Sequence, residues 1–208
     1  MFAELGHISL VLAFSLSAIN LGTSVKFYLN DNNIKYFNIA NNLLFYSSLL
    51  LITSFFILIL NYINSNFSLL NIYNNSHSSK PFIYKLSGTW GNHEGSLMMW
   101  LAFLGLYGCI YFFTIKNLTI KFANFVNISL SIIYLGFIGF TIFTSNPFIR
   151  VFPVPTEGLG LNPVLQDPGL AFHPPLLYLG YVGLTLPFSF AIAALLEGKV
   201  DYSWAKLV

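Results

Sequence analysis

Residues 161–183 read LNPVLQDPGLAFHPPLLYLGYVG and divide into a loop rich in proline and glycine and a long apolar run. The one histidine of this stretch, His173, stands directly before Pro174 and Pro175, where the apolar run begins. Proline is tolerated in the first turn of a helix because its missing N–H would have no partner there. The pattern therefore predicts a membrane helix over 176–196, with His173 just outside it and facing an aqueous or ligand-filled space.

The imidazole of His173 has two interpretations. A neutral imidazole held at the end of a membrane helix can serve as an axial ligand of haem iron. The alternative is a polar side chain that marks the membrane interface and binds nothing. The residues of this stretch leave both interpretations open.

The composition indicates an integral membrane protein. Of the 208 residues, 56% are hydrophobic and 8% are charged, whereas soluble domains carry about 25% charged residues. Such a chain cannot cover a soluble surface. Five apolar runs are long enough to span a bilayer, so we expect an all-α, polytopic fold in a single membrane domain over 1–208. The runs are 5–23, 43–63, 97–115, 122–144 and 176–196.

Several classes of function are excluded by what the sequence lacks. The nine basic residues are scattered over short loops, so no nucleic acid is expected as a partner. The single cysteine, Cys109, cannot form an internal disulfide or a CxxCH haem-attachment motif. There is no metal-site spacing, phosphate loop or nucleophile elbow, and no catalytic residue is assigned. The predicted spans hold almost no ionisable residue, which argues against ion translocation.

The distribution of lysine and arginine predicts the orientation, because both residues favour the inner side of a membrane. Six of the nine lie on one side of the predicted topology, which we assign to the inside. The N-terminus and the connections 64–96 and 145–175 then face outside. The proline-rich connection 145–175 is apolar enough to be an ordered loop at the outer face. The inner group is Lys26, Lys35, Lys116, Lys121, Lys199 and Lys206, and the outer group is Lys80, Lys85 and Arg150.

A second motif, SGTWGNHEGSLMMW at 87–100, precedes the third predicted helix. Ser96 is the expected N-cap of that helix. Glu94 lies where the helix dipole favours a carboxylate, which gives it a structural explanation. Trp90 suits the aromatic belt of a membrane interface, and His93 is either an interfacial histidine or a ligand.

These motifs resemble one protein family. WGNHEGSLMMW at 90–100, SNPF at 145–148 and the stretch 161–183 are similar to CcmF, the haem lyase of the multi-component cytochrome c maturation system. The resemblance runs from the first helix to the end of the chain and corresponds to the N-terminal part of the family only, as in mitochondrial forms encoded in separate pieces. It implies that His173 is one of two axial ligands of haem at the outer membrane face. The second ligand, and a tryptophan-rich segment resembling WGGWWFWDPVE, belong to a part of the family beyond Val208.

The resemblance also implies a function. The chain would be a membrane subunit that positions haem for thioether attachment to the CxxCH motif of apocytochrome c, and it is not expected to be catalytic without partner chains. The haem would be of b type and in transit, with its second ligand supplied by another chain. Expected partners are a C-terminal CcmF fragment or fragments, a haem chaperone, apocytochrome c with its thiol-reducing partner, and membrane lipid. Further candidates for a haem pocket are Trp90, His93, Glu94, Arg150 and Asp167.

Two alternatives accompany this hypothesis. Asparagine, isoleucine and phenylalanine are abundant, a bias common in organellar genomes, so we expect the mitochondrial inner membrane with the functional loops in the intermembrane space. The alternative location is a bacterial plasma membrane with these loops in the periplasm. The alternative function is a structural or transport subunit of a membrane complex with no haem ligation. The haem absorption of the chain copurified with its partners would separate these functions.

Overall fold

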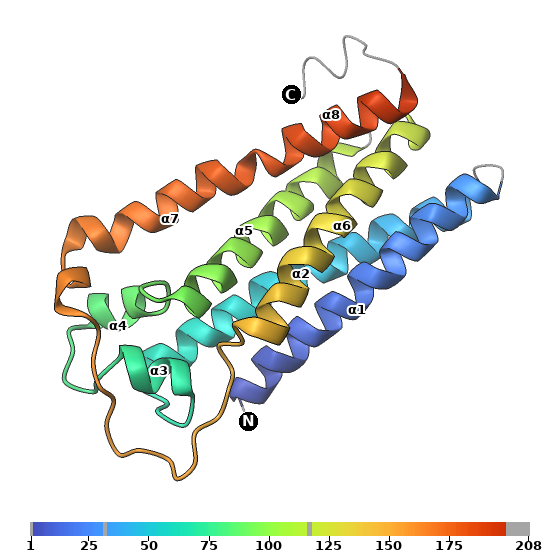
Figure 1. The fold of residues 1–208 in the computed structure, drawn as a ribbon. Coiled ribbons are helices and arrows are strands. Elements are labelled where there is room, and N and C mark those ends of the chain that lie inside the picture. Colours follow the sequence, from blue (N-terminus) through green and yellow to red (C-terminus); the bar gives the residue numbers. More distant parts are fainter. Residues whose placement is uncertain (1, 31–32, 116–117, 199–208) are drawn as a thin grey trace.

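The computed structural model describes residues 2–30, 33–115 and 118–198, which form helices joined by loops and contain no strand (Figure 1). The expected all-α, polytopic fold is confirmed. The helices are α1 (Phe2–Leu29), α2 (Ile34–Ile63), α3 (Leu70–Asn75), α4 (Phe82–Gly88), α5 (His93–Thr114), α6 (Ile120–Thr144), α7 (Pro168–Gly183) and α8 (Thr185–Glu197).

Five helical segments are long and apolar enough to cross a membrane, in agreement with the five predicted spans. Four are single helices, and the fifth, Ala171–Glu197, combines most of α7 with α8. The helices α1 and α2 run for 28 and 30 residues and extend well beyond the apolar runs. The extension has a simple cause, since each residue added to an existing helix gains a backbone hydrogen bond whether or not it is apolar.

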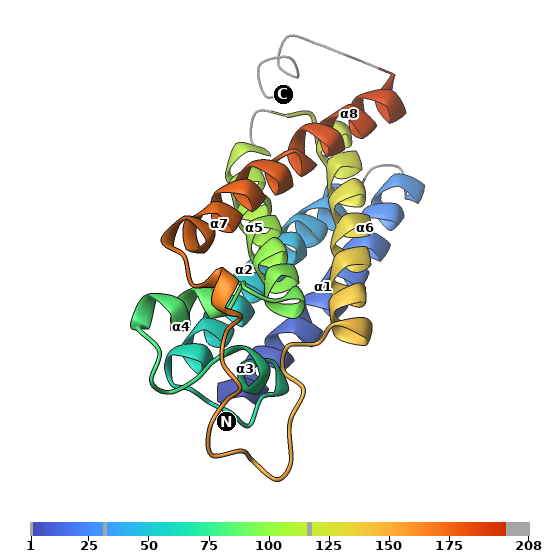
Figure 2. The same cartoon turned by 60° about the vertical axis from the view of Figure 1, so that its left-hand side comes forward.

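The spans form three layers (Figures 1 and 2). The antiparallel pair α1–α2 packs on α5 and α6, and α7–α8 packs on the other side of α5 and α6. The N-terminus, α3, α4 and the connection that follows α6 lie together at one end of the bundle. The Lys and Arg count assigns that end to the outside. Three residues of the inner group, Lys116, Lys199 and Lys206, lie outside the described residues.

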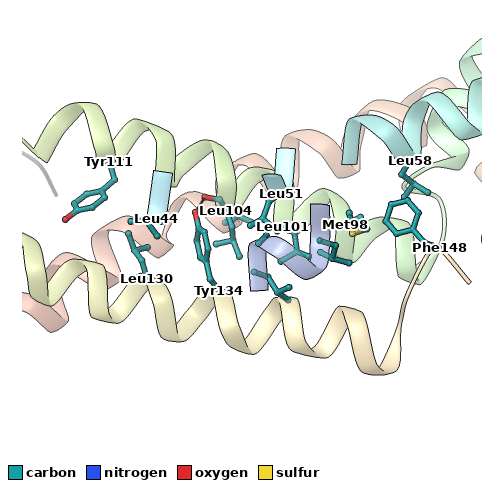
Figure 3. Close-up of a cluster of buried hydrophobic side chains, with 14 of the residues drawn as sticks. Leu44, Leu51, Leu58, Met98, Leu101, Leu104, Tyr111, Leu130, Tyr134 and Phe148 are labelled. Atoms are coloured by element: carbon teal, nitrogen blue, oxygen red, sulfur yellow. Dashed lines mark hydrogen bonds between the residues drawn. The ribbon is translucent and has the colours of Figure 1, made fainter. Parts of the chain in front are cut away.

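The core is a seam of large side chains between α2, α5 and α6 (Figure 3). Leu44, Leu51 and Leu58 of α2 recur at intervals of seven residues and are fully buried. They face a row from α5 and α6 that includes Leu104 and Tyr134. The seven-residue spacing places the three leucines on one side of α2, as in the seam of a coiled coil.

Small residues let these helices approach closely. A Cβ atom on Gly105 would lie 2.6 Å from the carbonyl oxygen of Ser48, and one on Gly108 would lie 2.2 Å from the hydroxyl of Tyr134. In a membrane, helices associate through close packing and hydrogen bonds, because lipid tails are as apolar as leucine. The glycines of α5 supply the close packing.

Hydrogen bonds between spans are the second contribution to helix association. The Tyr134 hydroxyl donates to the carbonyl of Leu104 over 2.7 Å and lies 2.9 Å from the Ser48 hydroxyl. On the other side of the bundle, Asn20 of α1 donates to the hydroxyl of Ser131 on α6 over 2.8 Å. These partners explain how spans almost free of charge can bury many serine and asparagine side chains.

The helix α7 begins at Pro168, so the expectation that this helix starts after Pro175 is wrong. Proline does occupy the first helical position, as the rule for helix starts requires, but the proline concerned is Pro168. The apolar sequence resumes at 170–172, and the N–H of Ala171 donates to the carbonyl of Asp167 over 2.9 Å. His173 therefore lies inside α7, and Pro174 and Pro175 lie in its interior.

Pro187, in the first turn of α8, marks the break between α7 and α8. Helix α7 ends at Gly183, and α8 begins at Thr185. Pro187 has no N–H to donate to the carbonyl four residues earlier, that of Gly183. The fifth span is therefore broken near Leu184.

The outer connection 145–167 is held by backbone hydrogen bonds to the segment around α3. Residues Leu69 and Arg150 form an isolated antiparallel bridge. Further along, the N–H of Leu159 donates to the carbonyl of Tyr73 over 2.7 Å. A Cβ on Gly158 would lie 2.1 Å from the carbonyl oxygen of Ser76, so the two segments are in close contact there. The connection is ordered by its contacts with protein.

Candidate functional site

His173 differs from the other histidines of the chain in its surroundings. Its side chain is exposed and makes no hydrogen bond or ion pair with the part of the chain that the structure describes. Each remaining histidine has a partner for Nε2: His7 lies 3.1 Å from Nδ2 of Asn146, His77 lies 3.3 Å from the carboxylate of Glu157, and His93 lies 3.0 Å from the hydroxyl of Ser145. Of the four histidines, His173 is thus the one with no partner at either ring nitrogen among the described residues.

The phase of α7 directs His173 away from the bundle. Ala171 and Val182, which are 2% and 0% exposed, mark the face of α7 that packs on α5. Successive residues of an α-helix are turned by about 100°, so His173 lies about 200° from Ala171, on the opposite face. Leu177 shares this outward face and is 45% exposed. Among the described residues, nothing covers this face.

A cleft of about 350 Å³ lies on the bundle side of α7. Trp90 and His93 line it from the start of α5, and Pro174 and Tyr178 line it from α7. The indole N–H of Trp90 donates to the carbonyl of Ala171 over 3.0 Å. Two of the predicted pocket residues therefore lie in one cleft, but they are separated from the His173 imidazole by the body of α7.

Glu94 belongs to a polar network at the outer end of α2 and α5. The amide of Asn71 donates to the Glu94 carboxylate over 3.2 Å and to Oδ1 of Asn92 over 2.7 Å. Asn92 in turn donates to the hydroxyl of Tyr62 over 2.9 Å. These bonds account for Glu94 as a structural residue that joins α3 to the start of α5.

The N-cap of α5 is Asn92, so the expectation that Ser96 caps this helix is wrong. Oδ1 of Asn92 accepts a hydrogen bond from the N–H of Gly95 over 2.8 Å. Ser96 lies inside the helix and donates to the carbonyl of Trp90 over 2.7 Å. Asn is as good an N-cap as Ser, and the helix begins earlier because the polar residues 93–96 are helical.

Neither Arg150 nor Asp167 lines the cleft. Arg150 forms an ion pair with Glu4 and a hydrogen bond with Ser68, so its guanidinium joins the outer connection to the start of α1. Asp167 directly precedes α7 and accepts the N–H of Ala171 through its backbone carbonyl. Arg150 is therefore a structural residue here, and Asp167 is a neighbour of the His173 helix.

The sequence did not single out Asn71, Asn92 or Tyr62, although they connect three helices. Asn92 could have been found, because an asparagine followed by an acidic residue in the first helical turn, here Glu94, is a common start signal. Asn71 and Tyr62 carry no such local signal, since their partners come from distant parts of the chain.

The residues at the outer end suit a haem better than a bare metal ion. The described residues contain no group of three or more His, Cys, Asp or Glu side chains that could hold a metal. Haem iron needs only axial ligands from the protein, because the porphyrin supplies the others. His173 offers one unpartnered imidazole beside Phe172 and Leu176, which are 61% and 68% exposed and can contact an apolar macrocycle.

Comparisons with known proteins agree on one family. A family model described as cytochrome c assembly protein matches residues 90–207. The cytochrome c-type biogenesis protein CycK of Bradyrhizobium diazoefficiens is 44% identical over 209 residues, which cover 100% of this chain and 31% of CycK. The cytochrome c-type biogenesis protein CcmF of Haemophilus influenzae is 40% identical over 207 residues, covering 99% of this chain and 32% of that protein.

A solved structure of the cytochrome c haem lyase CcmF has the same fold over this region. Its TM-score with the chain is 0.84 at 26% identity, and the match covers 98% of this chain and 32% of that one. The chain thus spans about a third of the length of the relatives and of the solved structure that it matches.

Proposed function

Because the chain belongs to the cytochrome c assembly protein family, we propose that it is a membrane subunit of a cytochrome c haem lyase and positions haem at the outer membrane face. The comparisons confirm the resemblance to CcmF drawn from the motifs at 90–100 and 161–183. The reaction assigned to the complex is thioether attachment of haem to the CxxCH motif of apocytochrome c. The chain alone covers about a third of its relatives, so the proposal assigns it positioning and leaves the complete reaction to the complex.

The observation that carries this proposal is the state of His173. Its imidazole is exposed, has no partner among the described residues, and stands on a face of α7 that those residues leave uncovered. We propose that His173 is an axial ligand of haem iron. When bound, haem supplies the vinyl groups that form the thioethers.

The other candidate residues act around this ligand in different ways. Trp90 contacts the backbone of α7 from the bundle side, while His93 and Glu94 are engaged with Ser145 and Asn71. Asp167 begins the helix that carries His173. Arg150 holds the outer connection against α1 through Glu4. We therefore assign iron binding to His173 alone and give the others roles in shaping its surroundings.

The second axial ligand is proposed to come from outside this chain. His7, His77 and His93 each have a partner at Nε2, so none of them is as available as His173. A bis-histidine haem would require a histidine from the two thirds of the family that this chain does not span. We propose that one or more C-terminal CcmF fragments with a tryptophan-rich segment pack on the outward face of α7, and that the haem is of b type.

The remaining partners and the location follow from the family. We propose that a haem chaperone delivers haem and that apocytochrome c, kept reduced by a thiol-reducing partner, receives it. The chain is a multi-pass membrane protein. The relatives named above are bacterial, which fits a bacterial plasma membrane with the outer end in the periplasm. The mitochondrial inner membrane stays a prediction from composition.

The experiment that tests this function is a haem measurement on the assembled complex. The complex is purified through a tag on this chain and titrated with haem, and its absorption spectrum is recorded in the oxidised and reduced states. Low-spin haem in a fixed ratio to this chain is expected, and the ratio should fall in a His173→Ala complex that contains the same subunits. A complex that never binds haem under these conditions would instead favour a structural or transport subunit.

A further inference from the structure

The interior prolines of α7 remove hydrogen-bond donors next to His173. In an α-helix, the N–H of residue 175 would donate to the carbonyl of Ala171. Pro175 has no N–H, and its ring also crowds that carbonyl. Helix α7 therefore lacks a backbone hydrogen bond at the carbonyl of Ala171, which is two residues before His173.

Trp90 supplies a donor at this point. Its indole N–H donates to the carbonyl of Ala171 over 3.0 Å, from a residue 81 positions earlier in the chain. An unpaired carbonyl within reach of lipid costs free energy, so the indole replaces the bond that Pro175 cannot make.

Trp90 is itself held firmly in the turn between α4 and α5. Its N–H donates to the carbonyl of Ser87 over 3.1 Å, and its carbonyl accepts the hydroxyl of Ser96 over 2.7 Å. The indole is half buried in the cleft against α7. The Trp90 indole therefore fixes the Ala171 carbonyl relative to α5, the helix at the centre of the bundle.

We propose that Trp90 is a positioning residue for His173: the Trp90–Ala171 hydrogen bond fixes the proline-containing turn of α7 and so fixes the direction of the His173 imidazole. The inference rests on the proposed role of His173 as a haem ligand. Trp90 touches neither the imidazole nor the outward face, so it acts through the backbone. A helix with two adjacent interior prolines could otherwise bend at this turn. The hydrogen bond opposes that bend and so keeps the imidazole in one direction.

The chain offers a matched control in Trp100. This residue also packs beside α7, 5.5 Å from the ring of Tyr178, and its ring stacks on Phe137 at 5.0 Å. Its Nε1 is buried and has no hydrogen-bond partner in the described structure. Trp100→Phe thus makes the same change of ring and removes an N–H that bonds to nothing, whereas Trp90→Phe removes an N–H that is used.

The experiment compares Trp90→Phe, Trp100→Phe, Pro175→Ala and the double variant Trp90→Phe/Pro175→Ala in the complex purified through this chain. The first measurement is backbone hydrogen–deuterium exchange of residues 168–180 without haem. We expect exchange at 171–173 to be about fivefold faster in Trp90→Phe, the factor for one net hydrogen bond, and unchanged in Trp100→Phe. Pro175→Ala restores the N–H of residue 175, so Trp90→Phe should have little effect in that background.

The second measurement is the absorption spectrum and midpoint potential of haem in the loaded complex. Trp90→Phe should shift the potential and broaden the low-spin bands, and Trp100→Phe should leave both unchanged. Equal exchange in wild type and Trp90→Phe would overturn the inference, as would an equal effect of the two tryptophan changes. If the exchange result is as expected but His173→Ala binds haem normally, the ligand assignment fails while the Trp90–Ala171 restraint stands.

Discussion

Nε2 of His93 lies 3.0 Å from the hydroxyl of Ser145, so the first residue of α5 is joined to the C-cap residue of α6. This contact engages His93 on the bundle side of the outer end. His173, on the outward face of α7, makes no such contact with the described residues. His93 thus joins two helices of the bundle, whereas His173 is free to bind a ligand.

Replacing His173 should abolish function without unfolding the protein. His173→Ala removes an exposed side chain, so the free energy of unfolding should fall by less than about 1 kcal/mol. An axial bond to iron has no substitute in a methyl group, so holo-cytochrome c should fall to near background while the complex persists. Haem staining of holo-cytochrome c and blotting of this chain measure the two effects.

The control for this prediction is His77→Ala. It removes the contact with Glu157 at the exposed outer connection, which is worth little, and holo-cytochrome c should stay near the wild-type level. Added imidazole should partly restore His173→Ala by filling the vacant position on iron. Normal maturation by His173→Ala would show that His173 is an interfacial residue and no ligand.

The chain without its partners should not hold haem stably. Only His173 of the four histidines is exposed and unpartnered among the described residues. It stands on a face of α7 that these residues leave uncovered, so a haem on this one ligand would have no enclosing pocket and should exchange readily. Titration of the purified chain with haem should yield no stoichiometric low-spin species. A six-coordinate haem in a one-to-one ratio with the chain would mean that both ligands lie within it.

The orientation can be tested with an impermeant thiol reagent in a Cys109→Ser background. Ser79 lies at the end of the bundle that the Lys and Arg count assigns to the outside, and Asn30 lies at the other end. Ser79→Cys should react in intact cells or mitoplasts, and Asn30→Cys should react only after the membrane is opened. The reverse pattern would invert the topology. Ser203, which lies beyond the described residues, gives a further inner position to label.

The close approach of α5 should make Gly108 intolerant of a side chain. A Cβ there would lie 2.2 Å from the Tyr134 hydroxyl and 2.3 Å from that of Ser48, so Gly108→Ala must break the contact between these two. Overpacking of this kind costs about 1–3 kcal/mol. Unfolding of the detergent-solubilised protein in sodium dodecyl sulfate measures it. Gly22→Ala, with no atom within 4 Å, should be neutral or stabilising, and equal stability of the two variants would contradict the packing.

The outer connection should loosen only below the ordinary pKa of a glutamate. Hydrogen bonds from the hydroxyl and N–H of Ser78 hold the pKa of Glu157 below its ordinary value of 4.5. Because the folded-state pKa is the lower one, this contribution to stability is complete above pH 4.5 and is lost as the pH falls through the folded-state value. Hydrogen exchange of residues 151–160, corrected for the intrinsic pH dependence of exchange, should therefore stay slow at pH 5 and rise only below pH 4.5. In Glu157→Gln this acid-dependent step should be missing.

The number and nature of the spans could be predicted because a bilayer demands about 20 apolar residues per helix. The short helices α3 and α4 could not be predicted in the same way. Their residues are polar and of mixed propensity, and α3 is fixed by contacts such as Asn71 to Glu94 that come from distant sequence. The start of α7 was predicted wrongly because three prolines compete for the first helical position, and Pro168 occupies it.

The site could be predicted only in part, for a related reason. The sequence context singles out His173 as a candidate haem ligand, which stays a prediction. The direction of its side chain depends on the phase of α7, which is known only once the start of the helix is known. Trp90 was assigned to an interfacial belt on composition. Its actual partner, the carbonyl of Ala171, lies 81 residues away and leaves no trace in the local pattern.

The ion pair between Glu4 and Arg150 has a consequence for biosynthesis. The two residues are 146 positions apart. Glu4 lies at the start of the first span, and Arg150 follows the fourth span in the sequence. A nascent chain that inserts its spans in order cannot form this pair until the fourth span is in place. Closure of the outer end through Glu4 and Arg150 is therefore a late step of assembly, and α1 must still be within reach of the connection after α6 when the fourth span is in place.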